Sequence, residues 1–157
     1  MGKAVSTSAT GGFLTVPVAT DGTDSIFQAL LQGITGLDGS KVMPAFQNPK
    51  PVYPPSDVNW VAFWFDSSTP DDSPVIEVGF FSRNILYALN IYTYGELSRE
   101  YMESIINGVT VKQNLEQVMA GGYTYQGIDT RPMQINELFN NQWYKRYNAV
   151  LLFGKHI

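Results

Sequence analysis

The chain of 157 residues contains no cysteine and few charged side chains. Without cysteine it can form no disulfide, no thiolate nucleophile and no cysteine-based zinc site. Only 15% of its residues are charged and its net charge is −4, whereas about 25% are charged in a typical soluble domain. Proteins that bind DNA through its phosphates need an excess of lysine and arginine. The composition therefore disfavours free nucleic-acid binding as the main function.

The sequence also lacks a long apolar run and the common catalytic motifs. No stretch approaches the roughly 18 apolar residues needed to cross a bilayer. P-loop, G-x-G-x-x-G and H-E-x-x-H motifs are absent. The single histidine, His156, lies next to the last residue, and Asp71 and Asp72 lie in a proline-bounded stretch typical of a solvated turn. We predict a protein that is not an enzyme and binds no metal or cofactor.

Aromatic side chains, in contrast, are abundant at 13% of the residues. Many lie in segments that read as β-strands, which are Asn59–Asp66, Val75–Phe81, Ile85–Tyr94 and a long final strand, Gln142–Phe153. A half-buried strand alternates apolar and polar residues, but the longer segments carry apolar residues on both faces. The close spacing of the first three predicts antiparallel pairing. Both faces of the sheet are therefore expected to be covered.

Three segments have apolar residues at helical spacing. The first is expected to follow a capping box at Ser25–Gln28 and to stop near Gly33–Gly36. The second runs from about Leu97 to about Gly108, and the third is expected to open with a capping box at Thr110–Gln113. The third should point Leu115, Val118 and Met119 inward and end at Gly121–Gly122. Between it and the final strand we predict a short strand, Tyr123–Ile128, and a connection, Arg131–Asn141.

These elements predict an α+β fold with a mixed, mostly antiparallel sheet and about three helices packed on one face. Residues 1–12 are small and polar and are expected to form a flexible segment. Residues 13–157 are expected to form a single domain. Its proline-rich part, residues 40–57, should be extended and free of regular structure, because its prolines favour a polyproline-type path.

Three helices can cover only one face of the predicted sheet, so the other face needs a second cover. A second copy of the chain is the economical candidate, and we predict an oligomer that buries this face. The alternative is that the proline-rich segment folds back over it. A solution mass measurement separates the two possibilities.

The final segment, LFNNQWYKRYNAVLLFGKHI, mixes rings and positive charge and raises two further alternatives. Single-strand nucleic-acid binders combine these groups, but Lys145 and Arg146 are adjacent on a strand and should point to opposite faces. A carbohydrate-binding module could stack sugars on Trp60, Trp64 or Trp143. Such a module would leave the helices without a role.

Several stretches, in this order, resemble the neck or tail terminator (tail completion) family of tailed bacteriophages. They are TGGFL, ITGLDGSKVMPAFQ, DVNWVAF, IYTYGELSREYMESIINGVTVKQNLEQVMAGG and NNQWYKRYNAVLLFGKHI. Tyr94-Gly95 is similar to the family's strand-ending YG, and Asn107-Gly108-Val109 with Gln113-Asn114 resembles its helix-to-helix corner. Trp143, Arg146 and Tyr147 resemble its W-x-x-R-x-D strand. Asn148 stands where the family usually has Asp, so a neutral hydrogen bond is expected in place of a salt bridge.

The resemblance implies a structural virion protein of the phage neck, made in the host cytoplasm. Such proteins form rings, commonly hexameric homo-oligomers, at the head-proximal end of the tail, where they stop tail-tube growth and join tail to neck. The implied partners are tail-tube and sheath proteins and neck or head-completion proteins, with DNA only as passing cargo and no membrane. Our candidate interface residues are Trp60, Trp64, Pro51, Tyr53, Pro54, Trp143, Arg146 and Tyr147. A head-completion adaptor or connector is the nearest alternative, and a carbohydrate-binding tail-associated module is the alternative from another class.

Overall fold

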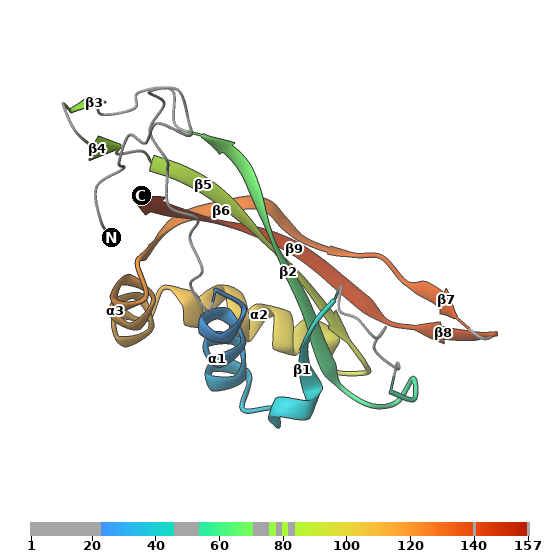
Figure 1. The fold of residues 1–157 in the computed structure, drawn as a ribbon. Coiled ribbons are helices and arrows are strands. Elements are labelled where there is room, and N and C mark those ends of the chain that lie inside the picture. Colours follow the sequence, from blue (N-terminus) through green and yellow to red (C-terminus); the bar gives the residue numbers. More distant parts are fainter. Residues whose placement is uncertain are drawn as a thin grey trace, which may run out of the picture.

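A computed structural model describes residues 23–45, 54–70, 76–77, 80–81, 84–139 and 141–156. Within this part of the chain, three α-helices lie on one face of a five-stranded sheet (Figure 1). The strand order is β1-β2-β5-β9-β6, in which only the β1–β2 pair is parallel. The predicted α+β class is confirmed, as are the mostly antiparallel sheet and the helices on one face.

The sheet is built from segments far apart in the sequence. Its strands are β1 (Val42–Pro44), β2 (Trp60–Pro70), β5 (Asn84–Tyr94), β9 (Arg146–His156) and β6 (Tyr123–Gln134). Two short ribbons stand outside it, β3 (Ile76–Glu77) with β4 (Phe80–Phe81) and β7 (Glu137–Phe139) with β8 (Gln142–Tyr144). The long β5 and β9 pair along their whole length and form the centre of the fold.

The helices are α1 (Thr23–Thr35), α2 (Ser98–Val109) and α3 (Lys112–Ala120), and a 3₁₀ turn, η2, spans Gly39–Lys41. All three helices were predicted, but both expected capping boxes were wrong. Ser25 lies inside the first turn of α1. The hydroxyl of Thr110 donates to the carbonyl of Asn107 (2.9 Å), and Val111, which makes no side-chain cap bond, precedes α3.

Four other predictions of local structure need correction. The segment 39–45 contains regular structure, η2 and β1, because Val42 is fully buried beside β2. The strand expected at Val75–Phe81 is instead the β3–β4 ribbon. The final strand is interrupted at Lys145 and forms β8 and β9. Met119, expected to point inward, is 61% exposed.

The largest correction concerns β6, which continues to Gln134 through most of the predicted connection. It is an edge strand with three register shifts against β9, and most of its second half is exposed. An exposed, irregular edge strand needs no apolar alternation. The polar stretch therefore gave no strand signal in the sequence.

The main core lies between the helices and the sheet. Phe27 of α1 contacts Phe65, Phe153 and Tyr123, with ring centroids 4.5, 4.8 and 5.2 Å away. Around these rings pack buried aliphatic residues of all three helices, including Leu31, Ile105 and Val118. A second, smaller cluster lies on the opposite face of the sheet, so the prediction of apolar residues on both strand faces is confirmed.

No helix in the described ranges is long and apolar enough to span a membrane. The N-terminal segment 1–12 and Asp71 and Asp72 lie outside the described residues. The same is true of the proline-rich residues 46–53.

Candidate functional site

The candidate site is the face of the sheet opposite the helices, here called the helix-free face. We define it by Trp60 and Trp64 of β2, Tyr92 and Tyr94 of β5, Tyr144 of β8, and Arg146 and Asn148 of β9. Alternate residues of a strand share a face, and the register pairs Trp60 with Tyr94, Tyr94 with Arg146, and Tyr92 with Asn148. The side chains of three neighbouring strands therefore gather there.

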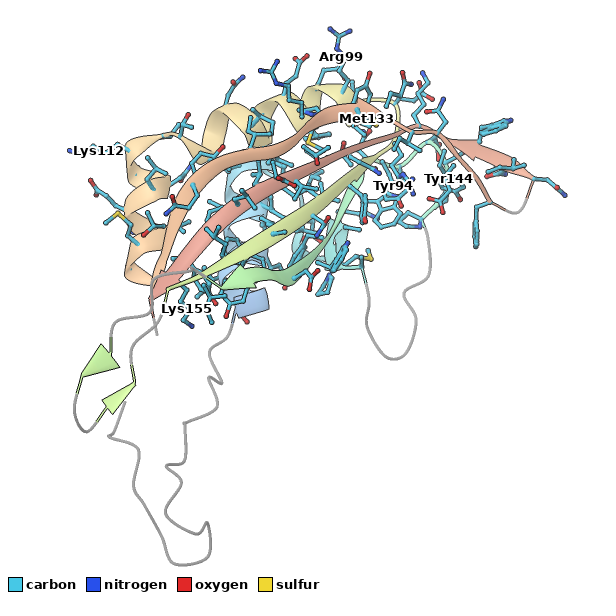
Figure 2. All side chains as sticks on the ribbon, turned by 90° about the horizontal axis from the view of Figure 1, so that it is seen from above. Tyr94, Arg99, Lys112, Met133, Tyr144 and Lys155 are labelled. Atoms are coloured by element: carbon cyan, nitrogen blue, oxygen red, sulfur yellow. The ribbon has the colours of Figure 1, made fainter. Side chains whose placement is uncertain are left out.

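A stack of aromatic rings forms the buried end of this face. Trp60 lies flat on Tyr94, with ring centroids 4.1 Å apart and an interplanar angle of 5°. Tyr144 meets Tyr94 edge-on at 6.4 Å, and the two lie near the base of the β7–β8 ribbon (Figure 2). The Tyr144 hydroxyl donates to the carbonyl of Pro54 (3.1 Å), which fixes the end of the proline-rich segment against this face.

Arg146 organises the polar part of the face. Its guanidinium donates to Glu137 Oε2 at 3.2 Å and lies 5.5 Å from the centroid of the Tyr92 ring. The Tyr94 hydroxyl donates to the same carboxylate oxygen at 3.1 Å. Burial alone would lower the pKa of Arg146, but hydrogen bonding with Tyr94 and the charge of Glu137 raise that pKa above its usual value. The guanidinium therefore carries its charge in a half-buried position.

Trp64 extends the polar part towards the middle of the sheet. Its indole Nε1 donates to the Tyr92 hydroxyl (2.9 Å), and the Tyr92 ring also contacts Arg146. Trp64, Tyr92, Arg146 and Glu137 thus form one continuous set of contacts across three strands and the ribbon. These groups supply ring surface, hydroxyls and one fixed positive charge, which is the chemistry of a protein-binding surface.

On this face the donor Nε of Arg146 and the acceptor Oδ1 of Asn148 are buried without a hydrogen-bond partner among the described residues. The neutral hydrogen bond expected from Asn148 is therefore not made by its side-chain oxygen. A buried polar atom without a partner costs roughly 1–3 kcal/mol. The two residues lie two positions apart on β9 and so face the same side.

The β7–β8 ribbon projects beyond the end of the sheet (Figure 1). Leu138 and Trp143 are cross-strand partners in it, and they are 57% and 67% exposed. On the other side of the ribbon Phe139 packs against Tyr144, with ring centroids 6.2 Å apart. One side of the ribbon therefore rests on the helix-free face, and the other presents apolar side chains to solvent.

The structure brings together Trp60, Trp64, Pro54 and Arg146 of the predicted interface residues. It places two elsewhere: Trp143 is on the exposed side of the ribbon, and Tyr147 packs against the core on the helix side. Pro51 and Tyr53 lie outside the described residues. Because Trp60 is only 1% exposed, its ring is not available for stacking on a sugar.

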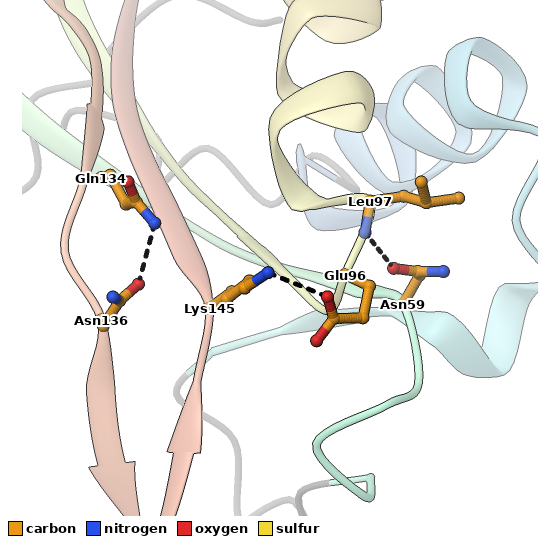
Figure 3. A network of polar contacts seen from close by, with 6 residues as sticks. All are labelled: Asn59, Glu96, Leu97, Gln134, Asn136 and Lys145. Atoms are coloured by element: carbon orange, nitrogen blue, oxygen red, sulfur yellow. Dashed lines mark hydrogen bonds and ion pairs between the residues drawn. The ribbon is translucent and has the colours of Figure 1, made fainter.

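Lys145 and Arg146 diverge, as the strand alternation predicted. Lys145 Nζ donates to Glu96 Oε2 at 2.9 Å, close to the start of α2 (Figure 3). This hydrogen bond and the charge of Glu96 raise the pKa of Lys145 above its usual value. Since Arg146 pairs with Glu137 instead, the two cations form no common patch for nucleic acid.

Sequence reasoning missed Tyr92, Tyr94 and Tyr144 as members of the site, Glu137 as the partner of Arg146, and Leu138 as the cross-strand neighbour of Trp143. Glu137 and Leu138 fall in the stretch read as a connection. Tyr92 and Tyr94 share a strand face, and the same alternation that grouped Trp60 with Trp64 could have identified them. The pairing of β5 between β2 and β9 was the missing information, since it places these tyrosines beside the tryptophans and Arg146.

A comparison with models of protein families matches residues 22–153 to the family described as phage neck terminator protein. The matched range includes the three helices and most of the sheet, and with them the helix-free face. A search of curated proteins gave no match.

Proposed function

We propose, since the chain belongs to the phage neck terminator protein family, that its copies form a ring which terminates the tail tube and joins it to the neck. Family membership makes it a structural protein of the virion neck that contacts other neck and tail proteins. Beyond what family membership gives, we propose that the copies form a ring at the head-proximal end of the tail. This ring would stop the growth of the tail tube. DNA would pass through this ring when the phage delivers its genome.

One observation supports the proposal more than any other: the helix-free face holds a half-buried, charged arginine among tyrosine and tryptophan side chains. Arg146 Nε and Asn148 Oδ1 have no partner among the described residues. Tyrosine, tryptophan and arginine are the residues most enriched at the energetic centres of interfaces. Both atoms are already enclosed by the chain itself, so a neighbouring subunit would cover the part of the Arg146 side chain that is still exposed, 20%, together with the rings beside it.

A ring requires a heterologous contact, in which a surface of one subunit meets a different surface of the next. The helix-free face meets this requirement, because it differs in shape and chemistry from the helix-covered side of the molecule. Its residues lie within the range matched by the family. We therefore assign it to the contact between successive subunits.

The first test compares two arginines that each pair with a glutamate at 3.2 Å. Arg146→Ala removes the half-buried pair of the helix-free face, whereas Arg99→Ala removes the exposed Arg99–Glu103 pair of α2. Arg146→Ala should reduce ring formation and the yield of complete particles by tenfold or more, as expected for an arginine at the centre of an interface. Arg99→Ala should leave both unchanged.

Ring formation is measured by negative-stain imaging of the purified protein, and completion is measured by the titre of phage that carry each variant. Circular dichroism separates an interface effect from a folding effect. Folded Arg146→Ala protein that assembles normally and yields normal infectious particles would refute the proposed role of this face.

A further inference from the structure

A groove of about 510 Å³ lies between α1 and α3, two of the helices that cover the sheet face opposite the proposed interface. On α1 the groove is lined by Ala29 and Gly33, which lie one turn apart and have little or no side chain. On α3 it is lined by Asn114 and Val118. A Cβ atom added at Gly33 would meet nothing within 4 Å. The groove is mostly apolar, with Ser25, Asn114 and Gln117 as its polar lining residues, and no charged side chain lines it.

The β7–β8 ribbon ends in a projecting knob that carries no charge and presents the apolar side chains of Leu138 and Trp143 on one side. Residues 138–143 read LFNNQW and include no charged residue. Leu138 and Trp143 stand side by side across the ribbon and are both more than half exposed. A two-stranded ribbon is at best marginally stable alone, so a partner that covers this pair would also stabilise its conformation.

The β7–β8 ribbon projects from one end of the molecule, whereas α3, one wall of the groove, lies near the other end (Figure 1). A chain cannot insert its own knob into its own groove, but each copy can offer its knob to the next copy and receive one in return. Such a head-to-tail contact closes into a ring when the rotation per subunit divides a full turn. Interface centres are poor in charged residues, and both surfaces are uncharged in a chain with net charge −4.

The knob is also continuous with the helix-free face. Phe139 and Tyr144 of the ribbon pack against each other and belong to the second core cluster with Trp60 and Tyr94. A copy that holds the knob is therefore brought next to Arg146, which pairs with Glu137 of the same ribbon. One neighbour can cover both surfaces.

The open edge of β6 is a poorer contact surface. Among the described residues β6 pairs with β9 alone. It carries register shifts, the charged residues Asp129 and Arg131, and Pro132. Bulges, charges and proline are the features that prevent an edge strand from pairing with another chain. Contact through side chains of the ribbon avoids this obstacle.

We infer that Leu138 and Trp143 of one copy insert into the α1–α3 groove of the next copy in the ring. This inference rests on the proposed ring, for which it names the pair of surfaces in contact. Trp143 is the anchor, since a tryptophan seated in a well-packed pocket is the commonest kind of interface hot spot. The polar Asn114, held by a 2.8 Å bond from its Nδ2 to the carbonyl of Gly108, lies in the groove wall.

The absence of cysteine allows a direct test by disulfide cross-linking. The double variant Leu138→Cys/Ala29→Cys places one thiol on the knob and one in the groove. Mild oxidation of assembled rings should link successive copies into a ladder of covalent oligomers. The matched double variant Leu138→Cys/Arg99→Cys places the second thiol on the exposed surface of α2 and should give no ladder.

Two substitutions test the same contact without cross-linking. Trp143→Ala and Gly33→Leu should each weaken association roughly 30-fold, the first by removing the anchor and the second by filling its place. Gln142→Ala, in the same ribbon, and Gln32→Leu, next to Gly33 in α1 but not part of the groove lining, are the controls and should assemble normally. Gly33→Leu should leave the monomer at least as stable, because glycine is unfavourable inside a helix.

The outcomes separate the inference from the proposed function. Rings that form normally in all variants, without a Leu138→Cys/Ala29→Cys ladder, overturn the knob-and-groove contact and leave the ring proposal intact. Particles whose necks contain no ring of this chain overturn both.

Discussion

Arg146 shows how one residue can be positioned by contacts that are remote in sequence. Glu137 accepts its hydrogen bond, Tyr92 lies beneath its guanidinium, and Tyr94 shares the same carboxylate. The side chains of Arg146 and Glu137 are 20% and 27% exposed, so solvent screens their interaction only partly. The pair also fixes the β7–β8 ribbon to the sheet, because Glu137 begins that ribbon.

Glu137→Gln should therefore destabilise the protein more than a comparable change on the surface. The substitution removes the charge that faces Arg146, and we expect a loss of about 1–2 kcal/mol in the free energy of unfolding. This corresponds to a fall of roughly 2–8 °C in Tm for a chain of this size. The control, Glu103→Gln, breaks the ion pair with Arg99, whose two side chains are 60% and 69% exposed. It should lower the free energy of unfolding by at most about 0.5 kcal/mol. Equal shifts in thermal unfolding for the two variants would contradict the role of Glu137.

At the scale of elements, the junction between β5 and α2 depends on one glycine and one asparagine. Gly95 has φ of +108°, and a Cβ there would lie 2.8 Å from the Cα of Asn59 and from the carbonyl oxygen of Val58. Asn59 Oδ1 accepts the N–H of Leu97 (2.9 Å) and so satisfies a backbone donor at the start of α2 (Figure 3). The Tyr94-Gly95 pair singled out in the sequence thus has a steric reason.

Gly95→Ala should cost more than about 2 kcal/mol of stability, because alanine disfavours this φ and its methyl group would displace Asn59. Asn59→Ala, which removes only the bond to Leu97, should cost about 0.5–2 kcal/mol. As a control, Gly122→Ala has a positive φ of +94° but open space around the added Cβ, so it should cost less than Gly95→Ala. Chemical denaturation measures the free energy of unfolding of the three variants. A Gly122→Ala protein that is less stable than the Gly95→Ala protein would show that crowding at Gly95 is unimportant.

The elements that sequence could predict are those with a local signal. Helical spacing identified α1, α2 and α3, and runs of apolar residues identified β2 and β5. The second half of β6 was missed because Asp129, Arg131 and Pro132 are typical of a connection, and only pairing with β9 makes the segment a strand. The capping box at Thr110 failed because the Thr110 hydroxyl donates to the Asn107 carbonyl at the end of α2. The box at Ser25 failed because α1 begins two residues earlier and Gln28 donates to the carbonyl of Val42.

The candidate site was predictable only in part, for the same reason. Trp60, Trp64 and Arg146 stood out by residue type, and alternation placed Arg146 away from Lys145. The stack of Trp60 on Tyr94 joins residues 34 positions apart, and it follows from the β2–β5 register, which no local pattern contains. Tyr147, selected for its aromatic ring, proved to belong to the helix side because it follows Arg146 on the strand.

At the scale of the whole molecule, the fold has one side closed by helices and one side on which rings and a charged group remain partly accessible. The β7–β8 ribbon projects from one end, and α3, which borders the uncharged groove, lies near the other (Figure 1). This asymmetry suits an assembly in which every copy has the same two neighbours, one on each side. Membership of the phage neck terminator family places the chain itself in the virion neck.

The most direct test is a cryo-EM map of the neck of the assembled particle, in which the chain is traced from its side chains. The proposed function predicts a closed ring of copies at the head-proximal end of the tail, with Arg146 of each copy covered by the next. A ring at the junction with the head, away from the end of the tail tube, would instead identify a head-completion adaptor. A ring at the tail end in which Arg146 and Asn148 face open solvent would contradict the assignment of the helix-free face as the subunit contact.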